Sequence, residues 1–181
     1  MAQTFLNLAQ GVTGTLPTSN YTSGITMADN WRLSSNASIS SGTNFLTANW
    51  EQNDSTGFSN IGTALTQSSG IFTFPSTGIY QITYECYATL ENDETGMKSL
   101  IAVTIDNSSY TNVAYGSSGI QRSSGNYELS SIAQFIFDVT DTTNCKIKFG
   151  YEAEVAPPDS VVNGSTNNNR TNFIAIRLGD T

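Results

Sequence analysis

The sequence predicts an all-β protein, an antiparallel two-sheet jelly-roll sandwich, from three observations. Apolar and polar residues alternate in several segments, as they do in strands with one buried face. Clusters of Gly, Pro, Asn, Asp and Ser separate these segments and favour turns. Charged residues make up only 12% of the 181 residues. This is about half the usual share of a soluble domain and disfavours surface helices built on Glu, Lys and Arg.

The alternation is clearest in residues 80–90, where Tyr80, Ile82 and Tyr84 face one way and mostly polar residues face the other. Shorter or less regular strands are expected at 25–33, 45–50, 71–74, 100–105, 110–115, 127–139, 145–153 and 173–178. Large rings are expected to meet between the sheets, where replacing Phe135 by alanine should cost about 3–5 kcal/mol. Ile132 and Ile136 fall on the opposite face of their strand, which predicts that part of that face is covered too.

Composition divides the chain into an attachment segment at 1–26 and a head domain at 27–181. The first segment begins without a basic region or a continuous apolar run, so we expect no signal peptide and synthesis in the host cytoplasm. No apolar stretch reaches the ~20 residues of a membrane helix, and no membrane insertion is expected. The net charge of −8 repels phosphate backbones, so nucleic acid is not an expected partner.

The chemistry of the side chains favours binding over catalysis. The chain has no histidine, which excludes Ser-His-Asp and Cys-His catalysis within it. Glu152 and Glu154 share one strand face and could form a glycosidase-like acid pair, but a solvated outer face beside Lys146 and Lys148 is the simpler interpretation. We therefore expect a protein that is not an enzyme.

Calcium is the one cofactor for which the sequence offers ligands; otherwise none is expected. Glu91, Asp93 and Glu94 share one loop, and Asp159 lies in another. Calcium takes six to eight oxygen ligands from carboxylates and carbonyls. A loop of solvated carboxylates is the alternative interpretation, because the spacing is not that of an EF-hand.

Two further groups of residues have alternative interpretations. Cys86 and Cys145 both fall on inward faces, where they could be bonded or could be two buried thiols. Tyr110, Tyr115, Tyr127 and Asn168 could bind a glycan, because rings stack on sugar faces and amides bond to hydroxyl groups. The same side chains also suit subunit contacts or simple exposure to solvent.

Residues 70–82 contain the order Phe72, Pro75, Gly78 and Tyr80. This pattern, Phe-x-x-Pro-x-x-Gly-x-Tyr, resembles the segment that leads into the long central strand in the head domains of the complement subcomponent one-q and tumour-necrosis-factor superfamily. The late strands at 131–139, 145–151 and 173–178 also match that family in order, over about residues 30–179. The resemblance implies a jelly-roll head that forms a homotrimer around a threefold axis.

The attachment segment resembles a second group of proteins. Gly11 to Pro17, with Val12 and Leu16 between its glycines and proline, is similar to a segment of tailed-phage fibre proteins, and residues 25–33 are similar to segments of phage and marine viral proteins. Together these resemblances imply a virion protein: a trimeric fibre knob, or a head fibre that decorates the capsid. Val12, Leu16 and Pro17 would attach it to other capsid or tail proteins.

Several functional alternatives remain beside this hypothesis. The distal loops could bind a receptor or glycan of the host surface, or the knob could serve only to decorate the capsid. A polysaccharide-degrading fibre enzyme is an alternative from a different class. A secreted lectin-like head is a third, which the expected lack of a signal peptide opposes.

Overall fold

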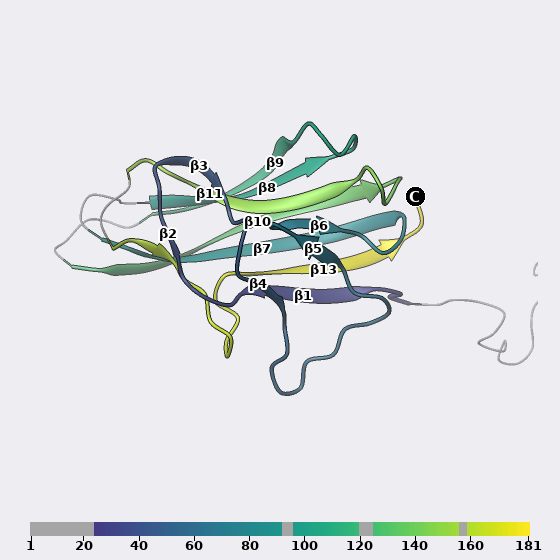
Figure 1. Ribbon diagram of the computed structural model, residues 1–181, viewed down its shortest axis with the longest axis horizontal. Helices are drawn as coiled ribbons and strands as arrows, with labels where there is room; N and C mark the ends of the chain where they lie inside the picture. The colour runs from purple at the N-terminus through teal and green to yellow at the C-terminus, as the bar shows by residue number, and fades with distance from the viewer. Residues whose placement is uncertain (1–23, 92–95, 120–124, 156–158) are drawn as a thin grey trace, which may run out of the picture.

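The computed structural model describes residues 24–91, 96–119, 125–155 and 159–181. These residues form strands and no helix, so none of them provides a helical membrane span. The strands make two antiparallel sheets whose strands run along the long axis of the molecule (Figure 1). The seven-stranded sheet consists of β1 (Ala28–Leu33), β2 (Ala37–Ser38), β4 (Trp50–Gln52), β7 (Gly78–Leu90), β10 (Tyr127–Val139), β12 (Val161–Val162) and β13 (Asn172–Gly179). The six-stranded sheet consists of β3 (Gly42–Phe45), β5 (Thr66–Ser68), β6 (Ile71–Thr73), β8 (Gly96–Thr104), β9 (Thr111–Gly119) and β11 (Lys146–Ala153).

In each sheet one strand pairs with several others. In the seven-stranded sheet, β10 pairs with β7 from Tyr127 opposite Leu90 to Val139 opposite Gly78. Strands β13 and β12 share the other edge of β7, and β1 lies beyond β13. In the six-stranded sheet, β11 lies between β8 on one edge and β3 and β6 on the other. This arrangement confirms the predicted antiparallel two-sheet jelly roll.

The core between the sheets is a cluster of aromatic rings, as the alternation predicted. Phe72 lies at its centre, with ring centroids 5.3 Å from Trp31, 5.5 Å from Trp50, 5.7 Å from Phe149 and 4.6 Å from Phe173. The ring of Phe72 meets these four edge to face, a favoured geometry for aromatic pairs. The core therefore depends on side chains from both sheets.

The segment around Gly78 shows why the Phe-x-x-Pro-x-x-Gly-x-Tyr pattern needs its residues. Phe72 and Tyr80 are both fully buried, and the Tyr80 hydroxyl donates to the Ser76 carbonyl at 2.9 Å, which braces the turn. Gly78 has φ +145°, and a Cβ there would lie 2.4 Å from Nε of Arg177 and 2.6 Å from the carbonyl oxygen of Gly179. Only glycine combines this backbone conformation with so little space.

The segment predicted as one strand at 45–50 proves to be two strand ends in different sheets. Strand β3 ends at Phe45 and pairs with β11, whereas β4 begins at Trp50 and pairs with β1. Between them Asn49 has φ +63°, a left-handed conformation that asparagine tolerates better than most residues. The Asn49 carbonyl accepts a hydrogen bond from the Ser34 backbone N–H at 2.7 Å, which fixes the reversal.

Strand β10 carries large side chains on both faces that remain partly exposed in the single chain. Phe135 points toward the core but is only partly buried, so it is not where aromatic truncation should cost most. Ile132 and Ile136 point outward and are 54% and 61% exposed in the isolated chain. The described residues of the same chain therefore cover less than half of each side chain, so the cover of this face is only partial.

Both cysteines are free and buried, which agrees with the interpretation of two inward thiols. Cys86 lies on β7 and Cys145 immediately precedes β11. Burial raises the pKa of the Cys86 thiol to about 12. The thiolate, which is the nucleophilic form, is therefore strongly disfavoured at neutral pH.

We expect native protein to resist alkylation at Cys86. At about pH 8, a thiol with an ordinary pKa near 8.5 is on the order of 10³-fold more ionised than one with a pKa of about 12. Intact mass after iodoacetamide treatment should show an unmodified Cys86 in native protein and two modified cysteines in guanidinium. Rapid native labelling of Cys86 would contradict the burial of this side chain.

Candidate binding surfaces

Two loops fold over the outer face of the seven-stranded sheet beside β1 and β4. One follows β4, the other precedes β13, and both project from the same side of the molecule (Figure 1). They cover Arg32, whose side chain lies on the outer face of β1 yet is fully buried. A buried guanidinium requires partners for its N–H groups, and the loops supply them.

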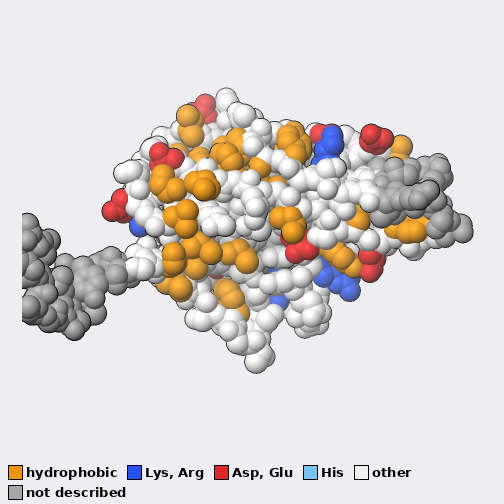
Figure 2. Space-filling view, turned by 180° about the vertical axis from the view of Figure 1, so that it is seen from behind, with side chains coloured by type: hydrophobic (Ala, Val, Ile, Leu, Met, Phe, Trp, Pro, Cys, Tyr) orange, Lys and Arg blue, Asp and Glu red, His pale blue; other side chains and the backbone are white. Residues whose placement is uncertain are grey.

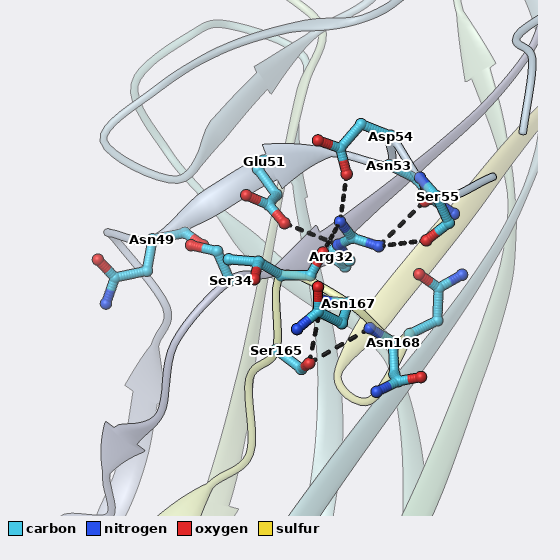
Figure 3. Close-up of polar contacts among 12 residues, drawn as sticks. Arg32, Ser34, Asn49, Glu51, Asn53, Asp54, Ser55, Ser165, Asn167 and Asn168 are labelled. Carbon is cyan, nitrogen blue, oxygen red and sulfur yellow. Dashed lines mark hydrogen bonds and ion pairs between the residues drawn. The ribbon is translucent and has the colours of Figure 1, made fainter.

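The Arg32 guanidinium joins these loops by direct bonds (Figure 3). Its Nε donates to Oε1 of Glu51 at 2.7 Å, and Nη2 donates to Oδ1 of Asp54 at 2.5 Å. Nη1 donates to Oγ of Ser55 at 2.6 Å, and Nη2 also donates to the Thr166 carbonyl of the second loop. One arginine therefore holds together two segments that lie far apart in the chain.

A set of side-chain amides continues the same contact along β1. Asn30 donates through Nδ2 to the Phe173 carbonyl at 2.7 Å. Its Oδ1 accepts from Nδ2 of Asn53 at 2.7 Å and from Nδ2 of Asn169 at 2.7 Å. These bonds satisfy the buried amides, so the arrangement around Arg32 and Asn30 serves structure.

This arrangement leaves a polar hollow above the loops but no free charge for a ligand. The hollow is lined by Asp54, Ser55, Thr56, Thr166 and Asn167. Arg32 bonds to two carboxylates, and this leaves it unsuited to bind an additional anion. We assign these residues to the positioning of the two loops.

Replacing Arg32 by methionine should destabilise the protein by about 2–4 kcal/mol, because several charge-assisted bonds are lost and buried acceptors are left unpaired. Arg170→Met is the matched control, since Arg170 is exposed and should change stability by less than ~0.5 kcal/mol. Chemical denaturation at one fixed protein concentration measures both. Equal effects of the two substitutions would contradict the assigned role of Arg32.

The rest of the same sheet face carries exposed aliphatic side chains among polar and charged ones. Four large aliphatic side chains are exposed there: Ile132 and Ile136 of β10, and Ile174 and Leu178 of β13. In β7, which lies between the two strands, Gln81 pairs with Ile136 and Thr83 with Ile174, whereas the charged Glu85 pairs with Ile132. We call Ile132, Ile136, Ile174 and Leu178 the apolar strip. Figure 2, from behind the view of Figure 1, shows apolar side chains gathered over this side of the molecule.

A shallow groove continues the apolar strip toward the loop that follows β4. Phe58 and Ser59 of the loop form one wall, and Ala28, Asn30 and Ile174 contribute to the other. Ile174 belongs to both the groove and the strip. Exposed apolar side chains therefore occur on this face from the β10 edge to the covering loop, with polar β7 side chains between them.

The structure brings together two of the four predicted glycan-binding residues. Tyr110 immediately precedes β9 of the six-stranded sheet, and Tyr115 lies within β9, where it pairs with Leu100. Tyr127 begins β10 of the other sheet, and Asn168 lies in the loop before β13, where its backbone N–H donates to Oγ of Ser165 at 3.2 Å. Glycan binding by these residues stays a prediction.

The remaining predicted site residues lie partly outside the described residues. The structure does not describe Val12, Leu16 and Pro17, nor Asp93 and Glu94. Glu91 is described and directly follows β7. Calcium binding in that loop and the attachment role of the first segment stay predictions. The described ranges hold no group of three or more Asp, Glu, Cys or His residues placed to bind a metal.

One member of the acidic pair considered for catalysis, Glu152, forms an ion pair with a lysine of the neighbouring strand. Glu152 accepts from Nζ of Lys98 at 2.5 Å across the β11–β8 pair, and Glu154 follows β11. This ion pair favours the interpretation of an outer sheet face over that of a glycosidase-like acid pair.

Comparison with known proteins identifies the fold of this chain but no family or function. No family model matches the chain, and no curated protein matches it. Among solved structures, murine APRIL at pH 8.5 is 10% identical, with a TM-score of 0.56 over 84% of this chain and 98% of that one. Eiger TNF from S. frugiperda is also 10% identical, with a TM-score of 0.58 over 87% and 96%. The chain therefore has the jelly-roll fold of tumour-necrosis-factor-like proteins.

Proposed function

We propose that the chain is a structural head protein of a virus particle, which assembles as a homotrimer and meets the outside through its jelly roll. The observation that carries the trimer is the apolar strip, which leaves Ile132 and Ile136 more than half exposed in the single chain. Exposed, contiguous apolar surfaces commonly mark protein contacts. The fold agrees with the trimer that the resemblance to tumour-necrosis-factor-like heads implies.

The two ends of this surface differ, which favours a ring over a twofold dimer. Ile132 and Ile136 project from the β10 edge, whereas Phe58 and Ile174 line the groove at the opposite end. A head-to-tail contact would place the β10 edge of one copy in the groove of the next. Repeated contacts of this kind close into a ring when the rotation fits, as a threefold rotation does.

The virion role is supported by the resemblance of residues 11–17 and 25–33 to phage fibre segments. In this proposal, the first segment attaches the trimer to capsid or tail proteins, and the head extends outward as a knob or capsid decoration. A host-surface receptor or glycan is the external partner. The chain has no catalytic role in this scheme.

Light scattering on the purified chain tests the assembly, and truncation tests the attachment. A solution mass near three times 19.4 kDa is expected, and a monomer would overturn the proposed trimer. The chain without residues 1–24 should still have a solution mass of three subunits, but it should no longer be incorporated into particles. Incorporation of the truncated chain at the level of the full chain would refute the attachment role.

A further inference from the structure

The outer face of the six-stranded sheet differs in character from the rest of this acidic protein. All three lysines of the chain, Lys98, Lys146 and Lys148, lie on it, because they alternate with core residues on β8 and β11. Rings of Phe45, Tyr110 and Tyr115 lie on the same face. Positive charge and aromatic surface are thus combined on the side of the sandwich opposite to the apolar strip.

Lys148 lies between two of these rings. Its Nζ is 3.8 Å from the ring centroid of Phe45 and 4.1 Å from that of Tyr110. The other two lysines have conventional partners, since Lys98 pairs with Glu152 at 2.5 Å and Lys146 donates to the Thr142 carbonyl at 2.7 Å. No carboxylate of the described residues pairs with Lys148. Burial lowers the pKa of this ammonium group, consistent with incomplete solvation.

The three rings have different surroundings. Phe45 lies beside Gly150, where a Cβ would come 3.0 Å from the ring and 2.1 Å from the Asn44 carbonyl oxygen. The Tyr115 hydroxyl accepts from Nδ2 of Asn112 at 2.9 Å, and its side chain is 49% exposed. The hydroxyl of Tyr110 is buried and has no hydrogen-bond partner among the described residues.

Covering the sheet explains only part of this arrangement. Leu100 and Ala102 point outward from β8 and yet are fully buried, so the rings partly serve to cover them. Covering requires neither a half-exposed Tyr115 ring nor a lysine without a carboxylate partner. These two features suit a ligand that offers an apolar face and a negative charge.

A groove at one end of the same face adds hydrogen-bonding groups. Thr43, Lys98 and Ser117 line it, beside Glu152 and Glu154. Strand pairing places Glu152 opposite Lys98 and Lys148 opposite Ala102, four residues further along, which corresponds to about 13 Å along the strands. The carboxylates at the groove end would repel an anion, so a negative group is directed to the Lys148 end.

We propose that this face binds an acidic oligosaccharide, with a sugar ring on Tyr115, a sugar carboxylate at the Lys148 ammonium, and hydroxyl groups toward the groove. The inference rests on the proposed function, because it identifies the external partner as a carboxylated glycan. The surface is separate from the apolar strip, so glycan binding and trimer formation can be tested independently.

Isothermal titration calorimetry of the full chain tests the proposal with three probes. Tetragalacturonic acid and 3′-sialyllactose offer carboxylates from uronic and sialic acids, and lactose is the neutral comparison. We expect one of the acidic probes to bind at least about tenfold more tightly than lactose, a difference of ~1.4 kcal/mol. Added salt should weaken that binding, because exposed charges are screened.

Variants of the strand and the ring locate the site. Lys148→Met should weaken binding about tenfold, whereas Lys146→Met, two residues away on the same strand face, should change it less than about twofold. Lys148→Arg keeps the charge and should retain binding. Tyr115→Ala should weaken binding about tenfold, and Tyr115→Phe, which keeps the ring, should weaken it less.

The solution mass of the same samples shows whether the trimer forms. Failure of glycan binding can therefore be told apart from failure of the proposed trimer. A trimer that binds neither acidic probe overturns the glycan inference alone. Equal binding of lactose overturns the requirement for a carboxylate. Equal losses in Lys146→Met and Lys148→Met, or a loss that Lys148→Arg shares, overturn the assigned role of Lys148.

Discussion

Replacing Ile136 by aspartate should convert the trimer into monomers. Ile136 is 61% exposed in the single chain and belongs to the apolar strip, so the proposed assembly buries it. An unpaired carboxylate in such a contact costs on the order of several kcal/mol through lost solvation. In a closed threefold ring the substitution occurs in all three contacts, which multiplies its effect. Light scattering should give a mass near 19.4 kDa instead of three times that value.

Ile105→Asp provides the matched control for this substitution. Ile105 is more exposed than Ile136, at 71%, but it lies in the turn after β8 and outside the apolar strip. The same chemical change there should leave the trimer intact. A trimeric Ile136→Asp protein would show that the subunits meet elsewhere, and dissociation by both substitutions would show a general effect of added charge.

Sequence alternation predicted the strands well where both faces of a strand obey it. Residues 80–90 and 127–139 were expected as strands, and β7 and β10 cover them. The same pattern assigned Cys86 and Cys145 to inward faces, and both are buried. Alternation depends on the pleat of one strand alone, which is why it is readable without knowledge of the partner strands.

The same reasoning failed where an outcome depends on the partner strand or on another chain. Residues 45–50 contain apolar residues suited to one strand, yet the left-handed Asn49 sends its two halves to different sheets. Ile132 and Ile136 were expected on a partly covered face, and the single chain leaves more than half of each side chain exposed. Periodicity states that a face is apolar; it does not state which molecule covers it.

Arg32 was missed for a related reason. A single arginine in a short strand has no distinctive local pattern, and its partners come from a loop about twenty residues away and from Thr166. The one available signal was the cluster of Glu51, Asn53 and Asp54, which supplies acceptors near a lone cation. Such contacts depend on loop closure, which sequence spacing does not define.

The rows of side chains on the outer face of the six-stranded sheet could be predicted only in part. Tyr110 and Tyr115 were identified as possible sugar-stacking residues from their type. Their association with Phe45 and Lys148 arises from the pairing of β3 with β11 and of β8 with its two neighbours. Strand order and register bring these residues together across about a hundred positions of sequence.

Phe72→Ala should destabilise the folded chain more than any other single aromatic truncation considered above, by about 3–5 kcal/mol. Phe72 is fully buried, and its ring packs edge to face against four other rings from both sheets. Truncation removes the apolar surface of the ring and leaves a cavity that strands fixed by backbone hydrogen bonds cannot close. Chemical denaturation at fixed protein concentration gives the difference in free energy.

Phe135→Ala and Ile105→Ala test whether the loss of stability follows the burial of the truncated side chain. Phe135 is partly buried, so its truncation should cost less than that of Phe72, contrary to the expectation from sequence. Ile105 is 71% exposed, and its truncation should change stability by less than ~0.5 kcal/mol. The order Phe72, Phe135, Ile105 follows from lost contacts alone. Equal costs for Phe135→Ala and Phe72→Ala would contradict the grading of these positions by burial.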